Sequence, residues 1–102
     1  MLASSVVAPF TVGTRELPSA VSDQVHNVFE RVGLLLGAAN GGWDDVLRMT
    51  FFVAGPDSRD AVDQEWITHF PDPDARPARH TQVATLPKGM EVQCEFLAYL
   101  AD

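Results

Sequence analysis

The chain has 102 residues, of which 46% are hydrophobic and 21% are charged, with 7 Lys and Arg residues against 14 Asp and Glu residues. This length fits one compact domain, residues 1–102, whose limited core would gain from burial against other copies. The net charge of −7 argues against nucleic acid or an anionic membrane as a main partner, because phosphate binding needs a surplus of Lys and Arg.

Cysteine content and hydropathy favour a reduced compartment. Cys94 is the single cysteine, so no intrachain disulfide and no Cys-based zinc site can form. Residues 1–8 lack a basic leader, and the longest apolar run, residues 32–39, is too short to cross a bilayer. We therefore expect a soluble cytoplasmic protein.

The first half of the chain predicts a strand and a helix. A β-prone run at residues 2–11 predicts the strand, and residues 13–18 form the loop that follows it. Apolar residues then recur at three- and four-residue steps, which predicts a helix with Ser19 or Ser22 as its N-cap. The Asn-Gly-Gly sequence at residues 40–42 supplies the left-handed conformation that ends a helix.

The run at residues 46–53 predicts the second strand. It is rich in β-branched and aromatic residues, and its alternation puts Leu47 and Met49 on one face and Arg48 and Thr50 on the other. Because both faces carry apolar residues, we expect both to be covered.

The second half predicts one more helix and two strands. The helix starts with Asp57 or Ser58 as its cap and ends before the prolines of residues 71–74. Strands follow at residues 78–86 and 91–100, the second with a clear two-residue alternation of apolar and polar side chains.

The element order β-α-β-α-β-β predicts an α+β sandwich, in which two helices cover one face of a mixed sheet. This arrangement leaves several apolar residues on a face without helices, and such a face is usually buried against other subunits. The residues concerned include Phe52, Leu97 and Tyr99. The sequence thus predicts an oligomer.

Motifs for metals and cofactors are missing from the sequence. His26, His69 and His80 are scattered, without the short spacing of a metal site, and no Walker loop, nucleophile elbow or dinucleotide fingerprint occurs. We expect no metal and no cofactor. His26 is interpreted as solvated, His69 as packed at the edge of the core, and Cys94 as a small core residue.

Two segments have the chemistry of a binding site. Arg79 follows Pro77 at the start of a strand, where a fixed guanidinium can present its planar fork to a ligand carboxylate. A surface salt bridge is the alternative for this arginine. Ser4 and Ser5 can line a pocket, or can simply be hydroxyls at a strand end.

Several segments, in their order and spacing, resemble the RidA (YjgF-like) family of reactive-intermediate deaminases. The resemblance covers nearly the whole chain, and its individual motifs are loose. It rests on residues 24–29, 34–39, 44–53, 77–79 and 86–89.

This resemblance implies a homotrimer whose three sheets form a central barrel, with ligand clefts between subunits and no cofactor. It implies that Arg79 binds the carboxylate of a small substrate and that Ser5 lies at the same site. The implied reaction is hydrolysis of a 2-iminoacid or enamine to a 2-ketoacid and ammonia. A ribonuclease role, sometimes attached to the family, fits poorly with the negative charge.

The sequence departs from the family at the residue that handles water, which is a glutamate on the last strand. Alignment on Leu86 places Gln93 at this position, whereas an ungapped count from Arg79 places Cys94 there, and neither side chain replaces a carboxylate. Glu95 shares the face of Gln93 and is the better candidate for the acid. The alternative is a non-catalytic member that binds small molecules or assists a pathway.

Overall fold

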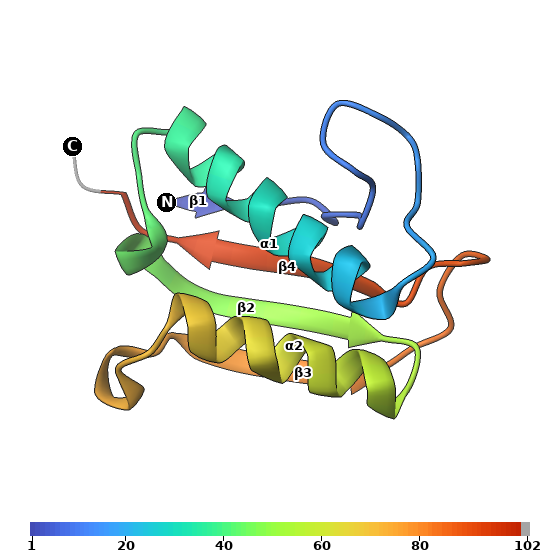
Figure 1. Cartoon of the computed structure of the whole chain (residues 1–102). Coiled ribbons are helices and arrows are strands. Elements are labelled where there is room, and N and C mark those ends of the chain that lie inside the picture. Colours follow the sequence, from blue (N-terminus) through green and yellow to red (C-terminus); the bar gives the residue numbers. More distant parts are fainter. Residues whose placement is uncertain (101–102) are drawn as a thin grey trace.

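Two helices cover one face of a four-stranded mixed sheet, as predicted (Figure 1). The computed structural model describes residues 1–100. The predicted element order is confirmed; the elements are β1 (Leu2–Ala3), α1 (Val21–Ala38), β2 (Val46–Val53), α2 (Pro56–His69), β3 (Ala78–Val83) and β4 (Val92–Ala98). Short 3-10 turns at Trp43–Asp45 and Pro73–Ala75 precede β2 and β3.

The strand order is β1-β4-β2-β3. The pairs β1–β4 and β4–β2 are antiparallel, whereas β2 and β3 are parallel. Parallel neighbours need a long crossover, which α2 provides. The last two strands in the sequence are therefore separated by β2, and β1 and β3 form opposite edges of the sheet.

The hydrophobic core lies between the helices and the sheet. Phe29 of α1 is fully buried at its centre and stacks on Phe51 of β2, with ring centroids 5.5 Å apart. On β4 the predicted alternation is confirmed, because every second residue is buried and the residues between them are not. The buried residues of β4 are Val92, Cys94, Phe96 and Ala98.

The prediction of one strand over residues 2–11 is only partly correct. Pairing with β4 starts at β1, but the ladder is interrupted, and contact resumes at a single bridge between Val7 and Cys94. At the interruption, the hydroxyl of Ser4 accepts a hydrogen bond from the backbone N–H of Phe96. The Ser4 hydroxyl thus takes the place of a backbone carbonyl as the acceptor for Phe96, and the strand ends there.

The bounds of β2 agree with the prediction, but the prediction for its faces needs one correction. Leu47 does not share the face of Met49: the register shifts between Val46 and Arg48, and this bulge leaves Leu47 exposed. In the part of the chain described here, helices cover one face only. The other face, with Thr50, is open in the single chain, so the expectation that this face is covered as well stays a prediction.

Both predicted helix caps are wrong. The N-cap positions are Ala20 and Gly55, and neither makes a side-chain cap hydrogen bond. Ser58 is instead buried in α2 and donates to Glu91 at 3.1 Å. The predicted helix end is confirmed, since Asn40 has the left-handed φ of 61°.

A buried glutamine joins α1 to the loops at one end of the sheet. The amide nitrogen of Gln24 donates to the carbonyl oxygens of Pro18 and Gly89, both at 2.8 Å. Its amide oxygen accepts from the backbone N–H of Glu91, also at 2.8 Å. Gln24 therefore satisfies three backbone groups that no strand ladder reaches.

Candidate functional site

Arg79 lies at the start of the edge strand β3, on the helix side of the sheet. It is opposite Met49 in the register of β2 and β3, and Met49 is buried under the helices. The guanidinium lies 5.7 Å from the ring centroid of Phe51 and 5.4 Å from that of Trp66. These cation–π contacts hold the group against the core.

The guanidinium of Arg79 is paired with an acidic side chain of α2. Arg79 forms an ion pair with Asp63 and donates from Nε to the hydroxyl of Thr81 at 2.9 Å. The side chain of Asp63 is 50% exposed and that of Arg79 is 20% exposed. In the single chain, Arg79 therefore makes the salt bridge that was the alternative to ligand binding. A carboxylate arriving from solvent can replace Asp63, because surface ion pairs are weak.

The open face of the sheet carries the two candidates for handling water. Glu95 is exposed and lies opposite Thr50. Gln93 is half-buried, lies opposite Phe52, and places its amide nitrogen 3.4 Å from the sulfur of Met90. Both side chains face away from the helices, as their alternation on the last strand predicts.

A histidine shares this face. His80 lies opposite Thr50 on β3, so Thr50 separates it from Glu95 in one row across three strands. From the sequence alone, His80 is a candidate only for a metal site. The alternation along β3 predicts which residues share its face, but only the pairing of β2 with β3 brings this imidazole into the row of Glu95.

Ser5 lies beside β4, in the interruption of the first strand. It falls between the contact of Ser4 with Phe96 and the bridge of Val7 with Cys94, and it is exposed. Of the predicted site residues on β4, Glu95 therefore lies nearest to Ser5. The hydroxyl of Ser4 has a structural partner, whereas the Ser5 hydroxyl makes no hydrogen bond to any of residues 1–100.

The predicted site residues fall into two groups within one chain. Ser5, Gln93 and Glu95 lie on the β1–β4 side of the sheet. Arg79 lies on β3, across β2, and on the other face. A single chain therefore does not bring Arg79 together with Glu95.

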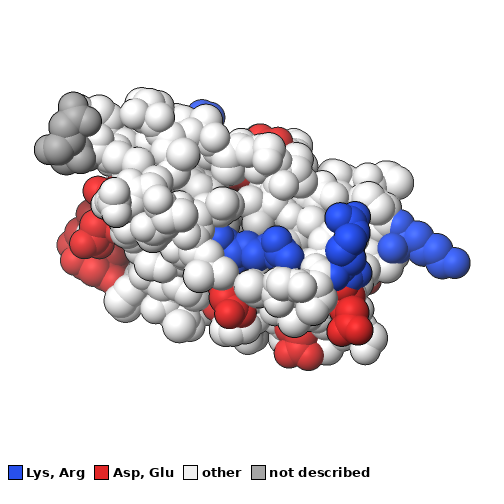
Figure 2. Space-filling model, turned by 90° about the horizontal axis from the view of Figure 1, so that it is seen from above, with Lys and Arg blue, Asp and Glu red and all other residues white. Residues whose placement is uncertain are grey.

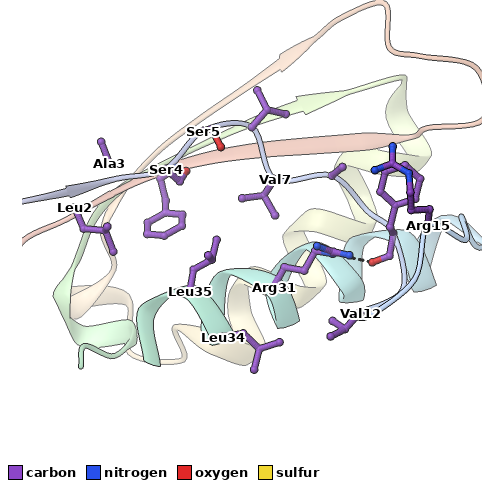
Figure 3. Close-up of a pocket in the computed structure, with 14 residues that line it drawn as sticks. Leu2, Ala3, Ser4, Ser5, Val7, Val12, Arg15, Arg31, Leu34 and Leu35 are labelled. Carbon is purple, nitrogen blue, oxygen red and sulfur yellow. Dashed lines mark hydrogen bonds between the residues drawn. The ribbon is translucent and has the colours of Figure 1, made fainter. Parts of the chain in front are cut away.

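A groove of about 610 Å³ runs between the N-terminal segment and α1 (Figure 3). Its apolar wall is formed mainly by five residues: Leu2, Val7, Leu34, Leu35 and Phe96. Arg15 and Arg31 lie at one end, and Ser4 and Ser5 also line it. We name it the Arg15–Arg31 groove.

Positive charge gathers on the side of the molecule where this groove opens. Figure 2 shows Lys and Arg side chains in a row across that face, with Asp and Glu side chains along its lower border. The chain has twice as many acidic as basic residues, yet the lining of the groove contains no Asp or Glu. The local charge is therefore opposite to the net charge.

Cys94 is excluded from the water-handling position. Its side chain is fully buried on the helix side of the sheet, whereas Gln93 and Glu95 face the other way. Burial raises the pKa of the Cys94 thiol far above its ordinary value, and the adjacent Glu95 carboxylate adds to the increase. The interpretation of Cys94 as a core residue is confirmed.

This environment predicts that the native thiol is inert. Because the reactive form is the thiolate, we expect Cys94 to react with a disulfide reagent at pH 8 at least about 100-fold more slowly in the folded than in the unfolded protein. Absorbance of the released thiol, in buffer and in guanidinium chloride, measures both rates. Equal rates would show that the thiol is accessible.

Two histidines meet one carboxylate between the helices. His69 packs at the core edge as predicted, with its ring 4.8 Å from that of Phe29 and 4.6 Å from that of Trp43. His26 is exposed, but its Nδ1 lies 3.1 Å from Glu65, which also approaches His69.

Within residues 1–100, no three His, Cys, Asp or Glu side chains cluster in a way that could hold a metal ion. No helix in these residues could span a membrane.

The chain is similar to proteins of one family over almost its whole length. A family model described as endoribonuclease L-PSP matches residues 2–100. The chloroplastic Reactive Intermediate Deaminase A of Arabidopsis thaliana is 32% identical over 82 residues, which are 79% of this chain and 43% of that protein. The chain thus spans less than half the length of this relative.

Solved structures agree with the fold described above. RidA from the Antarctic bacterium Psychrobacter sp. PAMC 21119 has a TM-score of 0.85 and 28% identity, covering 96% of this chain and 79% of that one. TdcF of E. coli, solved with bound serine, has a TM-score of 0.86 and 25% identity, covering 97% and 80%.

Proposed function

The chain belongs to the RidA/YjgF family, described by the endoribonuclease L-PSP model, and from this membership we propose that it hydrolyses 2-iminoacids or enamines to 2-ketoacids and ammonia. The observation that carries the proposal is its similarity to a protein named as a reactive intermediate deaminase. The net charge of −7 makes RNA an unfavourable substrate, because its backbone would be repelled.

The active site, in this proposal, lies between copies of the chain. Glu95 and Arg79 are two strands apart, which is roughly 10 Å of sheet, and they face opposite sides. In a closed ring of identical subunits, one edge of a subunit meets the opposite edge of the next. Such a ring brings the β3 edge that carries Arg79 in one copy to the β1–β4 edge of its neighbour, where Ser5 and Glu95 lie.

A homotrimer is the ring we propose, with the open sheet faces turned toward its axis. This face carries half-buried apolar side chains in the single chain, Phe52 and Leu97, and Tyr99 is 60% exposed nearby. Burying them against other copies adds hydrophobic stabilisation that a chain of this size needs. Light scattering should give about three times the chain mass of 11.1 kDa, and a stable monomer would contradict the assembly.

Arg79 has the role of substrate anchor. Its guanidinium exchanges Asp63 for the carboxylate of the substrate and holds that group in a two-point contact. The aromatic rings of Phe51 and Trp66 beneath it limit its movement. The imine carbon next to the bound carboxylate is thereby fixed relative to the catalytic water.

Glu95 has the role of general base. It takes a proton from water as the water oxygen bonds to the imine carbon and the electron pair of the C=N bond moves to nitrogen, and the protonated Glu95 then gives this proton to the nitrogen. The resulting carbinolamine then forms the C=O bond and releases ammonia. Gln93 lies two residues before Glu95 on the same face of β4. Its amide positions the water by hydrogen bonding.

The direct test of this activity is ammonia release from an iminoacid generated in the assay by an amino acid oxidase. We expect the 2-ketoacid and ammonia to appear faster with the protein than in buffer, at a rate proportional to protein concentration. A rate equal to that of spontaneous hydrolysis would contradict the enzyme proposal.

A non-catalytic binding protein is the second candidate, and Gln93 favours it. An amide has no useful pKa and cannot accept the proton of water. If the usual glutamate position is at Gln93, the Gln93→Glu variant should raise the rate of ammonia release by about 100-fold, the upper part of what one positioned base provides. If Glu95 is the base, Gln93→Glu should change the rate little, and Glu95→Gln should abolish the acceleration.

A further inference from the structure

We infer that the Arg15–Arg31 groove binds a small amphipathic carboxylate, with the charged group at the two arginines and an aliphatic tail along α1. Ser5 borders both this groove and the site proposed for the imine reaction, but the charged end of the groove is formed by Arg15 and Arg31, and Arg79 of the same chain lies across the sheet from it. The inference rests on the chemistry of the groove, on the way its arginines are held and on its size.

The two arginines are brought together by one residue. Arg31 of α1 donates from Nε to the carbonyl oxygen of Phe10 at 2.9 Å. The guanidinium of Arg15 lies over the ring of the same Phe10, 5.2 Å from its centroid. Both groups line the groove (Figure 3), Arg31 held by its hydrogen bond and the exposed Arg15 by its contact with the aromatic ring.

No acidic side chain compensates these charges. Among residues 1–100, neither Arg15 nor Arg31 forms an ion pair with Asp or Glu, although acidic residues are twice as numerous as basic ones. Because both arginines line one groove, their positive charges repel each other, and a bound anion reduces this repulsion. The planar fork of each suits a carboxylate, which can accept hydrogen bonds from both.

The rest of the groove selects the tail. Leu34 and Leu35 are 55% and 45% exposed on α1, and with Leu2 they extend the apolar surface away from the arginines (Figure 3). An aliphatic chain lying there would remove this surface from water. The volume of about 610 Å³ is that of a site for a small organic molecule.

Isothermal titration with octanoate tests the inference. Two control compounds are titrated in the same way: butyrate, which lacks the long tail, and octanol, which lacks the charge. We expect octanoate to bind, and butyrate and octanol to bind at least about tenfold more weakly, because each loses a contact worth roughly that factor. If octanoate gives no heat, or octanol binds equally well, the inference is wrong.

Variants locate the site. Arg15→Met keeps an aliphatic stem over Phe10 and should weaken octanoate binding about tenfold, as should Leu35→Asp, which adds a negative charge at an exposed position. Lys88→Met removes a positive charge elsewhere and should have no effect. Equal affinity in all three variants would overturn the assignment. Arg79→Ala should leave octanoate binding unchanged, so this result stands or falls separately from the imine activity.

Discussion

Replacing Arg79 by alanine is expected to lower kcat/KM for iminoacid hydrolysis by about 100- to 1000-fold, which is roughly 3 to 4 kcal/mol. The variant loses the two-point contact with the substrate carboxylate, so the imine carbon is no longer fixed relative to the catalytic water. Steady-state rates of ammonia release over a range of substrate concentrations measure the loss.

Three controls make this result specific. Arg79→Lys keeps the charge but not the planar fork, so it should recover only part of the activity. Lys88→Ala removes an exposed charge from the loop before β4 and should behave as the wild type. Asp63→Asn should lower KM, because the carboxylate that competes with the substrate is removed. An Arg79→Ala variant with wild-type kcat/KM would exclude Arg79 as the anchor.

Replacing Gln24 by leucine is expected to lower the free energy of unfolding by about 3 to 5 kcal/mol. Leucine fills a similar volume but leaves the carbonyl groups of Pro18 and Gly89 and the N–H of Glu91 without their partner. A backbone group that loses its hydrogen bond destabilises the folded state by about 1 to 3 kcal/mol where water cannot replace the partner, and water has little access here because Gln24 is buried.

Urea unfolding followed by tryptophan fluorescence measures this loss, since Trp66 is buried in the core. Gln64→Leu is the matched control: Gln64 is exposed on α2, and its replacement should change the unfolding free energy by less than about 0.5 kcal/mol. A Gln24→Leu protein as stable as this control would show that the three hydrogen bonds contribute little.

Local periodicity was enough to predict most of the fold. The apolar steps of α1 and the alternation of β2 and β4 depend on neighbours within a few residues, and these elements lie where the sequence predicts them. The failures involve distant partners. The bulge that exposes Leu47 depends on pairing with β4, and the first strand stops where Ser4 binds Phe96.

The candidate site was predictable to the same extent. Alternation on the last strand correctly puts Gln93 and Glu95 on one face and Cys94 on the other. The direction of Arg79 depends on how β3 pairs with β2, so the ion pair with Asp63 could not be predicted locally. The Arg15–Arg31 groove was missed for the same reason, because its two arginines meet only through the fold around Phe10.

The intersubunit site is the central claim, and subunit complementation tests it most directly. Arg79→Ala and Glu95→Gln should each be inactive as pure proteins. When equal amounts are unfolded together and refolded, about a quarter of the interfaces should combine an intact Arg79 with an intact Glu95, since each is present in half of the subunits.

The measurement is the rate of ammonia release by this refolded mixture. We predict about a quarter of the wild-type activity, against none when the two variants are refolded separately. Mixed oligomers without activity, or a Glu95→Gln protein as active as the wild type, would contradict the account.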